Sequence, residues 1–298
     1  MKLSLKKKAV IALCIVGLSY TLLNVSVRMM ELSFSPLTQV YLRIGLGFLL
    51  TLLFFSRNIH YPKIKRISRR DWIILLVMGL FGYGLAVIFV TLGVLQTKLL
   101  NVAIIASTTP FFVLFFSVMF LRKRVNNLLL LFLLVSFYGV CVIATHSFLP
   151  VLTHFGLGEL YVLLYAAGIG IYILGRKFLS DQLNNTEISA IVMCFAFITS
   201  LLCSLFVGET LSVSSFSNPT ALGGLLLGGV LNIIVVRLQN YGFQHLNEVL
   251  GSQLLLLENV YAPVIGWFLY QEKILSMELI GAVTVLVGVW AYNQYSHD

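Results

Sequence analysis

The sequence predicts an all-α integral membrane protein of ten transmembrane helices in two inverted five-helix repeats. Three observations predict this fold class: a shortage of charged residues, ten apolar runs of spanning length, and basic residues confined to alternate loops. The chain of 298 residues is 59% hydrophobic and 10% charged, with a mean hydropathy of +0.97. A soluble domain carries about 25% charged residues, so most of this surface must face lipid rather than water.

The spans follow from the length of the apolar runs, because a membrane-crossing helix needs about 20 mostly apolar residues. Ten runs meet this requirement, at 8–28, 35–56, 72–95, 100–121, 127–146, 157–177, 187–207, 219–243, 248–270 and 275–293. They show no period-two alternation, so they are helices and not barrel strands. The first run is longer than a usual signal-peptide core and is expected to remain as a helix.

The basic residues predict the orientation. Fifteen lysines and arginines fall on the side of the N-terminus, and three, Arg28, Lys98 and Lys273, fall on the other side. Because cytoplasmic loops are enriched in Lys and Arg, we expect a multi-pass protein of the inner membrane with both termini in the cytoplasm. The net charge of +9 therefore has a topogenic role, and no motif accompanies it that would indicate nucleic-acid binding.

A shift of 149 residues aligns the two halves of the chain, 1–149 and 150–298, span for span. Under this shift Gly79 meets Gly228, Gly93 meets Gly242, and Gly139 meets Gly288, where about 0.8 glycine coincidences are expected by chance. Five spans per half is an odd number, so the second half must cross the membrane upside down relative to the first. Such inverted repeats place a site near the midplane that can open to either side.

Two stretches carry a family resemblance, Phe89–Pro110 and Val260–Val289, the second with the turn Gln271-Glu272-Lys273 before a glycine-bearing last helix. The chain resembles the drug/metabolite transporter superfamily, and within it the EamA-type ten-helix transporters. Two positions depart from the pattern: Lys123 stands where a glutamate is expected, and Asn259 stands at the counterpart of Pro110. The resemblance implies transport of amino acids, nucleotide-related metabolites, sugars or drugs.

Glu258 is the acidic residue that the sequence places deep in a span, with Asn259 beside it and Tyr261 one turn on. Ionisable residues at membrane depth are expensive and face the bundle interior. Glu258 can bind a substrate amine or carry a coupling proton, or it can form a structural ion pair with Arg237. Arg237 can in turn hold a substrate carboxylate or extend toward the cytoplasm.

Further polar side chains lie within other spans, and five of them fall at a similar estimated depth to Glu258: Tyr20, Tyr83, Thr108, Tyr165 and Asn232. They form stripes at helical spacing, and we predict that they line a cavity with Glu258; they are Tyr20, Asn24, Tyr83, Thr108, Tyr165, Asn232 and Gln239. Tyrosines and amides with apolar walls suit an amphipathic organic ligand. The alternative for each residue is a hydrogen bond that joins two helices.

The expected function is secondary transport of a small polar or amphipathic metabolite by alternating access. An amino acid or related compound is the expected substrate, and export is favoured over uptake by a permease of the same fold. A non-transporting receptor or assembly subunit is the alternative from another class. No catalytic cluster and no phosphate-binding loop of the G-x-x-x-x-G-K-[ST] type occur in the sequence, so an enzyme is not expected. Neither a metal nor a cofactor is expected, and the oligomeric state is not predicted.

Overall fold

The computed structural model describes residues 4–97, 99–149, 156–271 and 274–296, and every regular element within these ranges is helical. Ten helical stretches of the described residues are long and apolar enough to cross a membrane, which confirms the predicted all-α membrane class. Their bounds differ from the predicted ones by at most three residues. Lys98, Glu272 and Lys273 lie outside the described residues.

Several spans consist of more than one helix. In chain order the elements are α1 (Leu5–Glu31), α2 (Pro36–Phe55), η1 (Ser56–Asn58), α3 (Tyr61–Ile64), α4 (Arg69–Val77), the π-helical η2 (Met78–Leu85), α5 (Ala86–Gln96), α6 (Leu99–Ala106), α7 (Thr109–Leu121), α8 (Asn127–Thr145), α9 (Leu157–Phe178), α10 (Asn185–Val207), η3 (Val213–Ser217), α11 (Pro219–His245), α12 (Glu248–Leu255), α13 (Leu257–Tyr270) and α14 (Ser276–Tyr295). The third span joins α4, η2 and α5; the fourth joins α6 and α7; the ninth joins α12 and α13.

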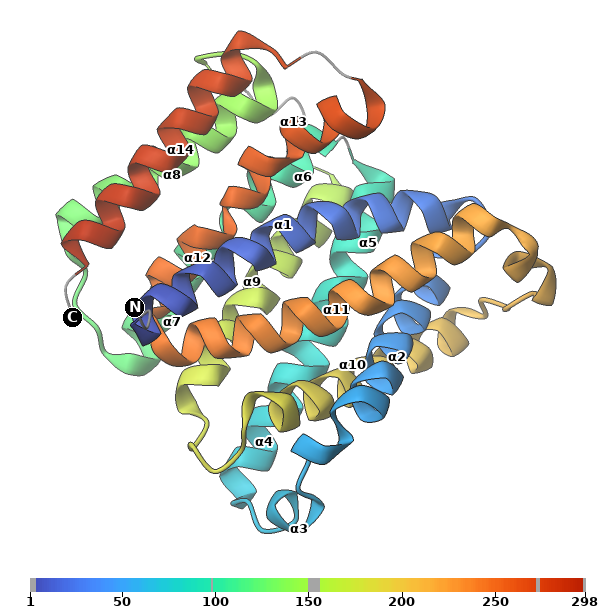
Figure 1. Ribbon diagram of the computed structural model, residues 1–298. Helices are drawn as coiled ribbons and strands as arrows, with labels where there is room; N and C mark the ends of the chain where they lie inside the picture. The colour runs from blue at the N-terminus through green and yellow to red at the C-terminus, as the bar shows by residue number, and fades with distance from the viewer. Residues whose placement is uncertain (1–3, 98, 150–155, 272–273, 297–298) are drawn as a thin grey trace.

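The start of α1 and the end of α14 lie at the same end of the bundle, as an even number of crossings requires (Figure 1). We call this end, where α1 begins, the N-terminal face, and the end where α1 stops the opposite face. The short helix α3 and the starts of α4, α10 and α12 belong to the N-terminal face, because successive spans run in opposite directions.

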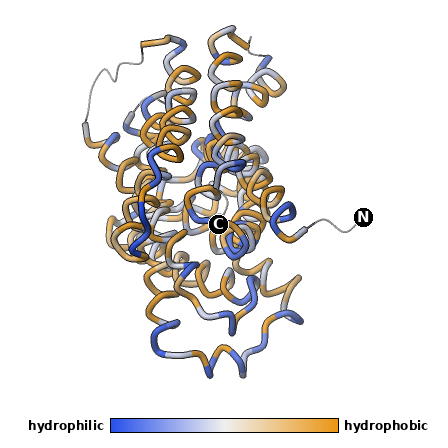
Figure 2. The backbone as a smooth tube through the Cα atoms, turned by 90° about the vertical axis from the view of Figure 1, so that its left-hand side faces the viewer, coloured by the Kyte–Doolittle hydropathy of each residue, from blue (hydrophilic) through white to orange (hydrophobic). Residues whose placement is uncertain are grey.

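The outer surface of the bundle is apolar along the spans. Large hydrophobic side chains are exposed there, among them Phe54, Phe206 and Phe268, which are 75%, 93% and 76% exposed. Figure 2 shows hydrophobic residues along most of each helix and hydrophilic stretches concentrated in the connecting segments at the bottom of the view. Such side chains would be unfavourable in water, so the surface is built for lipid.

Carboxylates and amides begin several helices. Asn184 Oδ1 accepts the backbone N–H groups of Thr186 and Glu187 at 2.9 Å each, and Glu187 Oε2 accepts the N–H of Asn184 at 2.8 Å. This reciprocal cap fixes the start of α10. At the opposite face Glu209 caps α2 from a distant loop, accepting the N–H of Leu37 at 3.1 Å and that of Thr38 at 2.7 Å.

Four pairings organise the bundle. Helix α1 packs along α11, α5 packs along α9, α2 packs along α10, and α8 packs along α14 as a peripheral pair (Figure 1). The α8–α14 crossing depends on Gly139: a Cβ atom there would lie 2.7 Å from the backbone nitrogen of Val285 and 2.8 Å from the carbonyl oxygen of Gly281. Only glycine therefore lets these two backbones approach so closely.

Two spans are broken in mid-course, and the breaks correspond. Helix α6 ends at Ala106 and α7 begins at Thr109, while α12 ends at Leu255 and α13 begins at Leu257. Leu256 in the second break follows Ser107 in the first by 149 residues. Pro110 causes the first break because it lacks the N–H that would reach the carbonyl of Ala106, and the Thr109 hydroxyl donates to that carbonyl instead at 2.7 Å.

Candidate functional site

Glu258 is the second residue of α13, directly after the break in the ninth span. Its Oε1 atom accepts a hydrogen bond from Asn24 Nδ2 at 2.9 Å, and its backbone oxygen accepts one from the Thr21 hydroxyl at 3.1 Å. Helix α1 therefore holds α13 at this point. The other carboxylate oxygen, Oε2, accepts no hydrogen bond from the described residues.

Glu258 and its partner Asn24 are less buried than most polar side chains of the bundle interior. Glu258 itself is half-buried and Asn24 is exposed. Within the described part of the chain, no lysine, arginine or histidine lies within 4 Å of this carboxylate. The site thus offers one carboxylate oxygen without a hydrogen bond and one amide, with no cation among the described residues within 4 Å.

Tyrosines surround the carboxylate. The Tyr20 hydroxyl donates to Gln239 Oε1 at 2.9 Å, and Tyr20 lies within electrostatic range of Tyr83, Tyr165 and Glu258. Tyr20 and Tyr165 are half-buried, like Glu258. Gln239 is fully buried, and its Nε2 atom finds no partner among the described residues.

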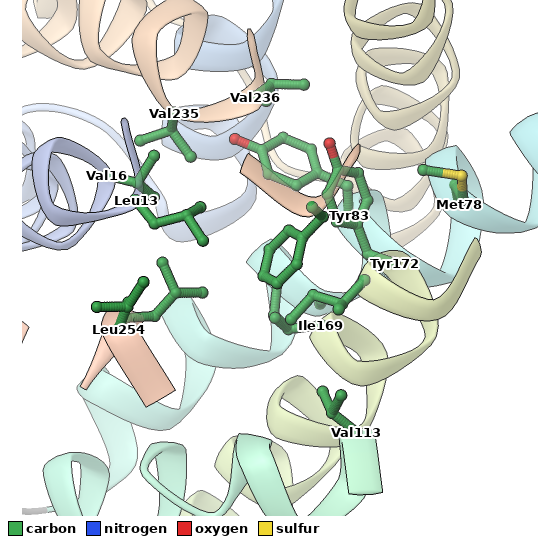
Figure 3. Packing of buried hydrophobic residues seen from close by; sticks show 14 of the residues in the cluster. Leu13, Val16, Met78, Tyr83, Val113, Ile169, Tyr172, Val235, Val236 and Leu254 are labelled. Carbon is green, nitrogen blue, oxygen red and sulfur yellow. The ribbon is translucent and has the colours of Figure 1, made fainter. Parts of the chain in front are cut away.

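Tyr83 and Asn232 are hydrogen-bonded to each other and not to the Glu258 carboxylate. The Tyr83 hydroxyl donates to Asn232 Oδ1 at 2.6 Å, and Asn232 Nδ2 donates to the carbonyl of Gly228 at 2.7 Å. Both residues are buried, and they lie 149 positions apart in the sequence. Tyr83 stands beside Tyr172, with ring centroids 5.9 Å apart (Figure 3). This pair therefore joins the third and eighth spans in the present conformation.

The remaining predicted residues lie at the helix breaks or beside them. Thr108 is in the first break, and its hydroxyl donates to the carbonyl of Ile105 at 2.6 Å. Asn259 Nδ2 donates to Ser107 Oγ at 3.2 Å and so joins the two breaks directly. Tyr261 packs against Gly17 of α1.

Arg237 lies apart from this group. Its guanidinium carbon is 4.1 Å from the centroid of the Phe55 ring, near the N-terminal face. It forms no ion pair with Glu258 within the described residues. The structure therefore separates two residues that the sequence suggested as partners.

Two surface cavities lie at the N-terminal face. One has a volume of about 720 Å³ and is bordered by Phe55, Thr186, Ile234 and Arg237; the other has about 680 Å³ and is bordered by His60, Lys63 and Arg66. Neither is lined by Glu258 or by the tyrosines around it.

An ion pair that the sequence did not reveal joins the fourth and ninth spans at the N-terminal face, and we call it the lock. Lys123 Nζ lies 2.7 Å from Glu248 Oε1, and Glu248 is 1% exposed while the lysine is 42% exposed. Lys177 of α9 also donates to the backbone oxygen of Leu246. Lys123 and Glu248 are 125 positions apart, and only the departure of Lys123 from the family pattern marked it as unusual.

Gln253 is a second residue that sequence reasoning missed. It lies five residues from both Glu248 and Glu258 on the ninth span, is 0% exposed, and has no hydrogen-bond partner among the described residues for either its oxygen or its nitrogen. A buried amide without partners costs about 1–3 kcal/mol for each unpaired group. Gln253 could have been found from the sequence, because it is a polar residue within an otherwise largely apolar run.

Comparison with known proteins decides the family. The model of the EamA-like transporter family matches residues 7–145 and again residues 156–294. The chain belongs to the EamA-like transporter family. It is a multi-pass membrane protein and a transporter, in accordance with the family resemblance seen in the sequence.

The relatives agree with this class. A protein of Archaeoglobus fulgidus described as an uncharacterized transporter is 25% identical over 96% of this chain and 98% of its own length. The pseudopaline exporter CntI of Pseudomonas aeruginosa is 24% identical over 99% of both chains. A solved crystal structure with 14% sequence identity has a TM-score of 0.76 over 97% of this chain and 98% of its own, and shares the fold.

Proposed function

We propose that this protein is a secondary transporter that exports a small polar or amphipathic metabolite bearing an amine, an amino acid or related compound, by alternating access. The observation that carries the proposal is the Glu258 carboxylate, half-buried at a helix break with one oxygen unfilled. A carboxylate at membrane depth is tolerated where it meets water or a charged partner. A protonated amine of the substrate is such a partner, while Tyr20 and Tyr165 offer aromatic walls.

Two inverted halves, 1–149 and 150–298, supply the moving parts in this proposal. The family model matches each half separately. Gly93 of α5 lies against Val162 of α9, and Gly242 of α11 lies against Leu13 of α1. Each residue of the second contact is separated from its counterpart in the first by 149 positions. Equivalent contacts and equivalent helix breaks support a pseudo-two-fold axis in the membrane plane, which allows opening to either side.

The present conformation, in this account, is closed at the N-terminal face and open opposite. The lock between Lys123 and Glu248 and the bond from Lys177 to Leu246 favour closure at one end. Asn24, which contacts Glu258, is exposed and lies in the half of α1 nearer the opposite face. We propose that the N-terminal face is cytoplasmic, because the basic residues gather there.

Gln253 then belongs to the pathway toward the cytoplasm. Its two unpaired polar atoms are unfavourable in the closed state and become hydrated once the fourth and ninth spans separate. Three polar side chains then follow one another along the ninth span: Glu258 at the site, Gln253 halfway, and Glu248 at the lock.

Transport from proteoliposomes tests the proposal. The full chain is reconstituted in vesicles loaded with a metabolite extract, and release is followed by mass spectrometry in parallel with the Glu258→Gln variant. We expect amine-bearing metabolites to leave with the wild-type chain and to be retained with Glu258→Gln. One relative is named as an exporter, the pseudopaline exporter CntI, and this supports export as the direction of transport. Net movement only in the uptake direction would reverse the proposed direction, and binding without flux would indicate a receptor.

A further inference from the structure

The groove beside Arg237 combines an apolar wall with one cation. It has a volume of about 720 Å³ and lies where α2 ends and α10 begins, with α11 beside both. Phe55, Ile233, Ile234 and Leu238 provide the apolar wall. Arg237, eight residues before the end of α11 and so about 12 Å of helix from it, provides the charge.

The groove is lined by a different face of α11 from the one that packs into the bundle. Asn232, Val236 and Gln239 form the buried face of α11 and point into the bundle. Ile233, Arg237 and Tyr241 recur every four residues on another face and are half-buried. The lining residues therefore belong to the surface that α11 presents beside α2 and α10, not to the site around Glu258.

Arg237 has unfilled hydrogen-bonding capacity. Its guanidinium stacks on Phe55, and none of its five donors reaches an acceptor among the described residues. The polar residues that line the groove do not supply an acceptor for Arg237. Asn184 caps α10, and Asn185 accepts a hydrogen bond from Arg176 at 3.2 Å and donates one to Gln244 at 2.8 Å. The Glu187 carboxylate beside the groove already accepts from the backbone nitrogen of His60 at 3.0 Å.

We propose that this groove binds an anionic phospholipid of the leaflet at the N-terminal face, with the headgroup phosphate on Arg237 and an acyl chain along Ile233, Ile234 and Leu238. A phosphate accepts the paired donors of a guanidinium, and an acyl chain is the natural occupant of an apolar groove at membrane depth. His60 also borders the neighbouring cavity that Lys63 and Arg66 line. Arg237 and these two cations outnumber the Glu187 carboxylate beside the groove, and this balance favours an anion.

Native mass spectrometry of the full chain in detergent tests this. Phosphatidylglycerol and phosphatidylcholine of the same acyl composition are titrated against the wild type, Arg237→Gln, and the control Arg124→Gln, which removes an exposed cation at the same face. We expect phosphatidylglycerol to be retained over phosphatidylcholine, and Arg237→Gln to weaken its retention about fivefold while Arg124→Gln leaves it unchanged.

Three results would overturn the proposal: equal retention of the two lipids, no effect of Arg237→Gln, or binding of glycerol phosphate that displaces the lipid from Arg237, which would indicate a site for a soluble anion. If Arg237→Gln fails to fold, Ile233→Trp fills the groove while keeping the charge. This variant is expected to lose the same bound lipid, and full retention in it would equally contradict the groove as the binding site.

Discussion

In the proposed mechanism the ion pair between Lys123 and Glu248 holds the N-terminal face closed, and Lys123→Met tests this role. The substitution keeps an unbranched chain of similar length but removes the one cation that contacts the Glu248 carboxylate, 1% exposed, among the described residues, and leaves Lys177 as a more distant charge. Removing one partner of a buried ion pair costs about 3–5 kcal/mol. Because the lysine is 42% exposed and therefore partly screened, we expect only about 1–3 kcal/mol of this cost in the closed state.

This cost falls on the closed state alone, since Glu248 reaches water once the face opens. The ratio of inward-open to inward-closed molecules should therefore rise about 5- to 150-fold. The assay is the rate at which an impermeant maleimide labels Gln253→Cys from the cytoplasmic side of inside-out vesicles, in a chain whose four native cysteines are replaced. Arg124→Gln, beside the lock but exposed, is the matched control and should leave the rate unchanged.

A labelling rate for Lys123→Met within twofold of its parent would refute the reasoning. It would mean that the ion pair is a surface contact without influence on opening, or that Gln253 does not lie on the path to the cytoplasm. A rate that rises equally in Arg124→Gln would show that loss of positive charge at this face, and not loss of the lock, is responsible.

Three further predictions concern the fold and the interior contacts. Gly139→Ala should lower the free energy of unfolding in detergent by about 1–3 kcal/mol, because the added methyl group meets the backbone of α14. Gly223→Ala is the control: its methyl group meets only the end of the Met29 side chain, at 3.4 Å, and it should be neutral in the same melting experiment. A double-mutant cycle of Tyr83→Phe and Asn232→Ala, followed by unfolding, should give a coupling of about 0.5–1.5 kcal/mol, and additive effects would show that their 2.6 Å contact is not energetically relevant. Glu209→Ala should destabilise the chain by about 1–2 kcal/mol because it uncaps α2, and an unchanged melting temperature would contradict that role.

The spans could be predicted from sequence because the bilayer imposes one rule on every residue of a crossing segment. Part of the site was accessible for the same reason. Glu258 and Asn24 stand out as polar residues at membrane depth, and the structure joins them at 2.9 Å. Tyr83 and Asn232 were also predicted to line the cavity. In the structure they are hydrogen-bonded to each other, which agrees with the alternative that they join two helices.

Long-range pairings could not be predicted, because nothing local encodes them. Glu209 and the start of α2 are 172 positions apart, and Glu248 and Lys123 are 125 apart. The break at Leu256 falls inside a run of leucines with no proline or glycine to mark it, in contrast to the break that Pro110 announces. Arg237 illustrates the same limit: its depth suggested Glu258 as a partner, but the direction of its side chain depends on the packing of α11 against α2.

The central claim is that one polar space around Glu258 opens to each side of the membrane in turn. Labelling of Glu258→Cys, in the chain without native cysteines, by an impermeant thiol reagent tests it most directly in right-side-out and inside-out vesicles. We expect Glu258→Cys to be labelled from both sides. Lys123→Met should increase the labelling rate from the cytoplasmic side and decrease the labelling rate from outside. A thiol reached from one side only, whatever the state of the lock, would contradict it.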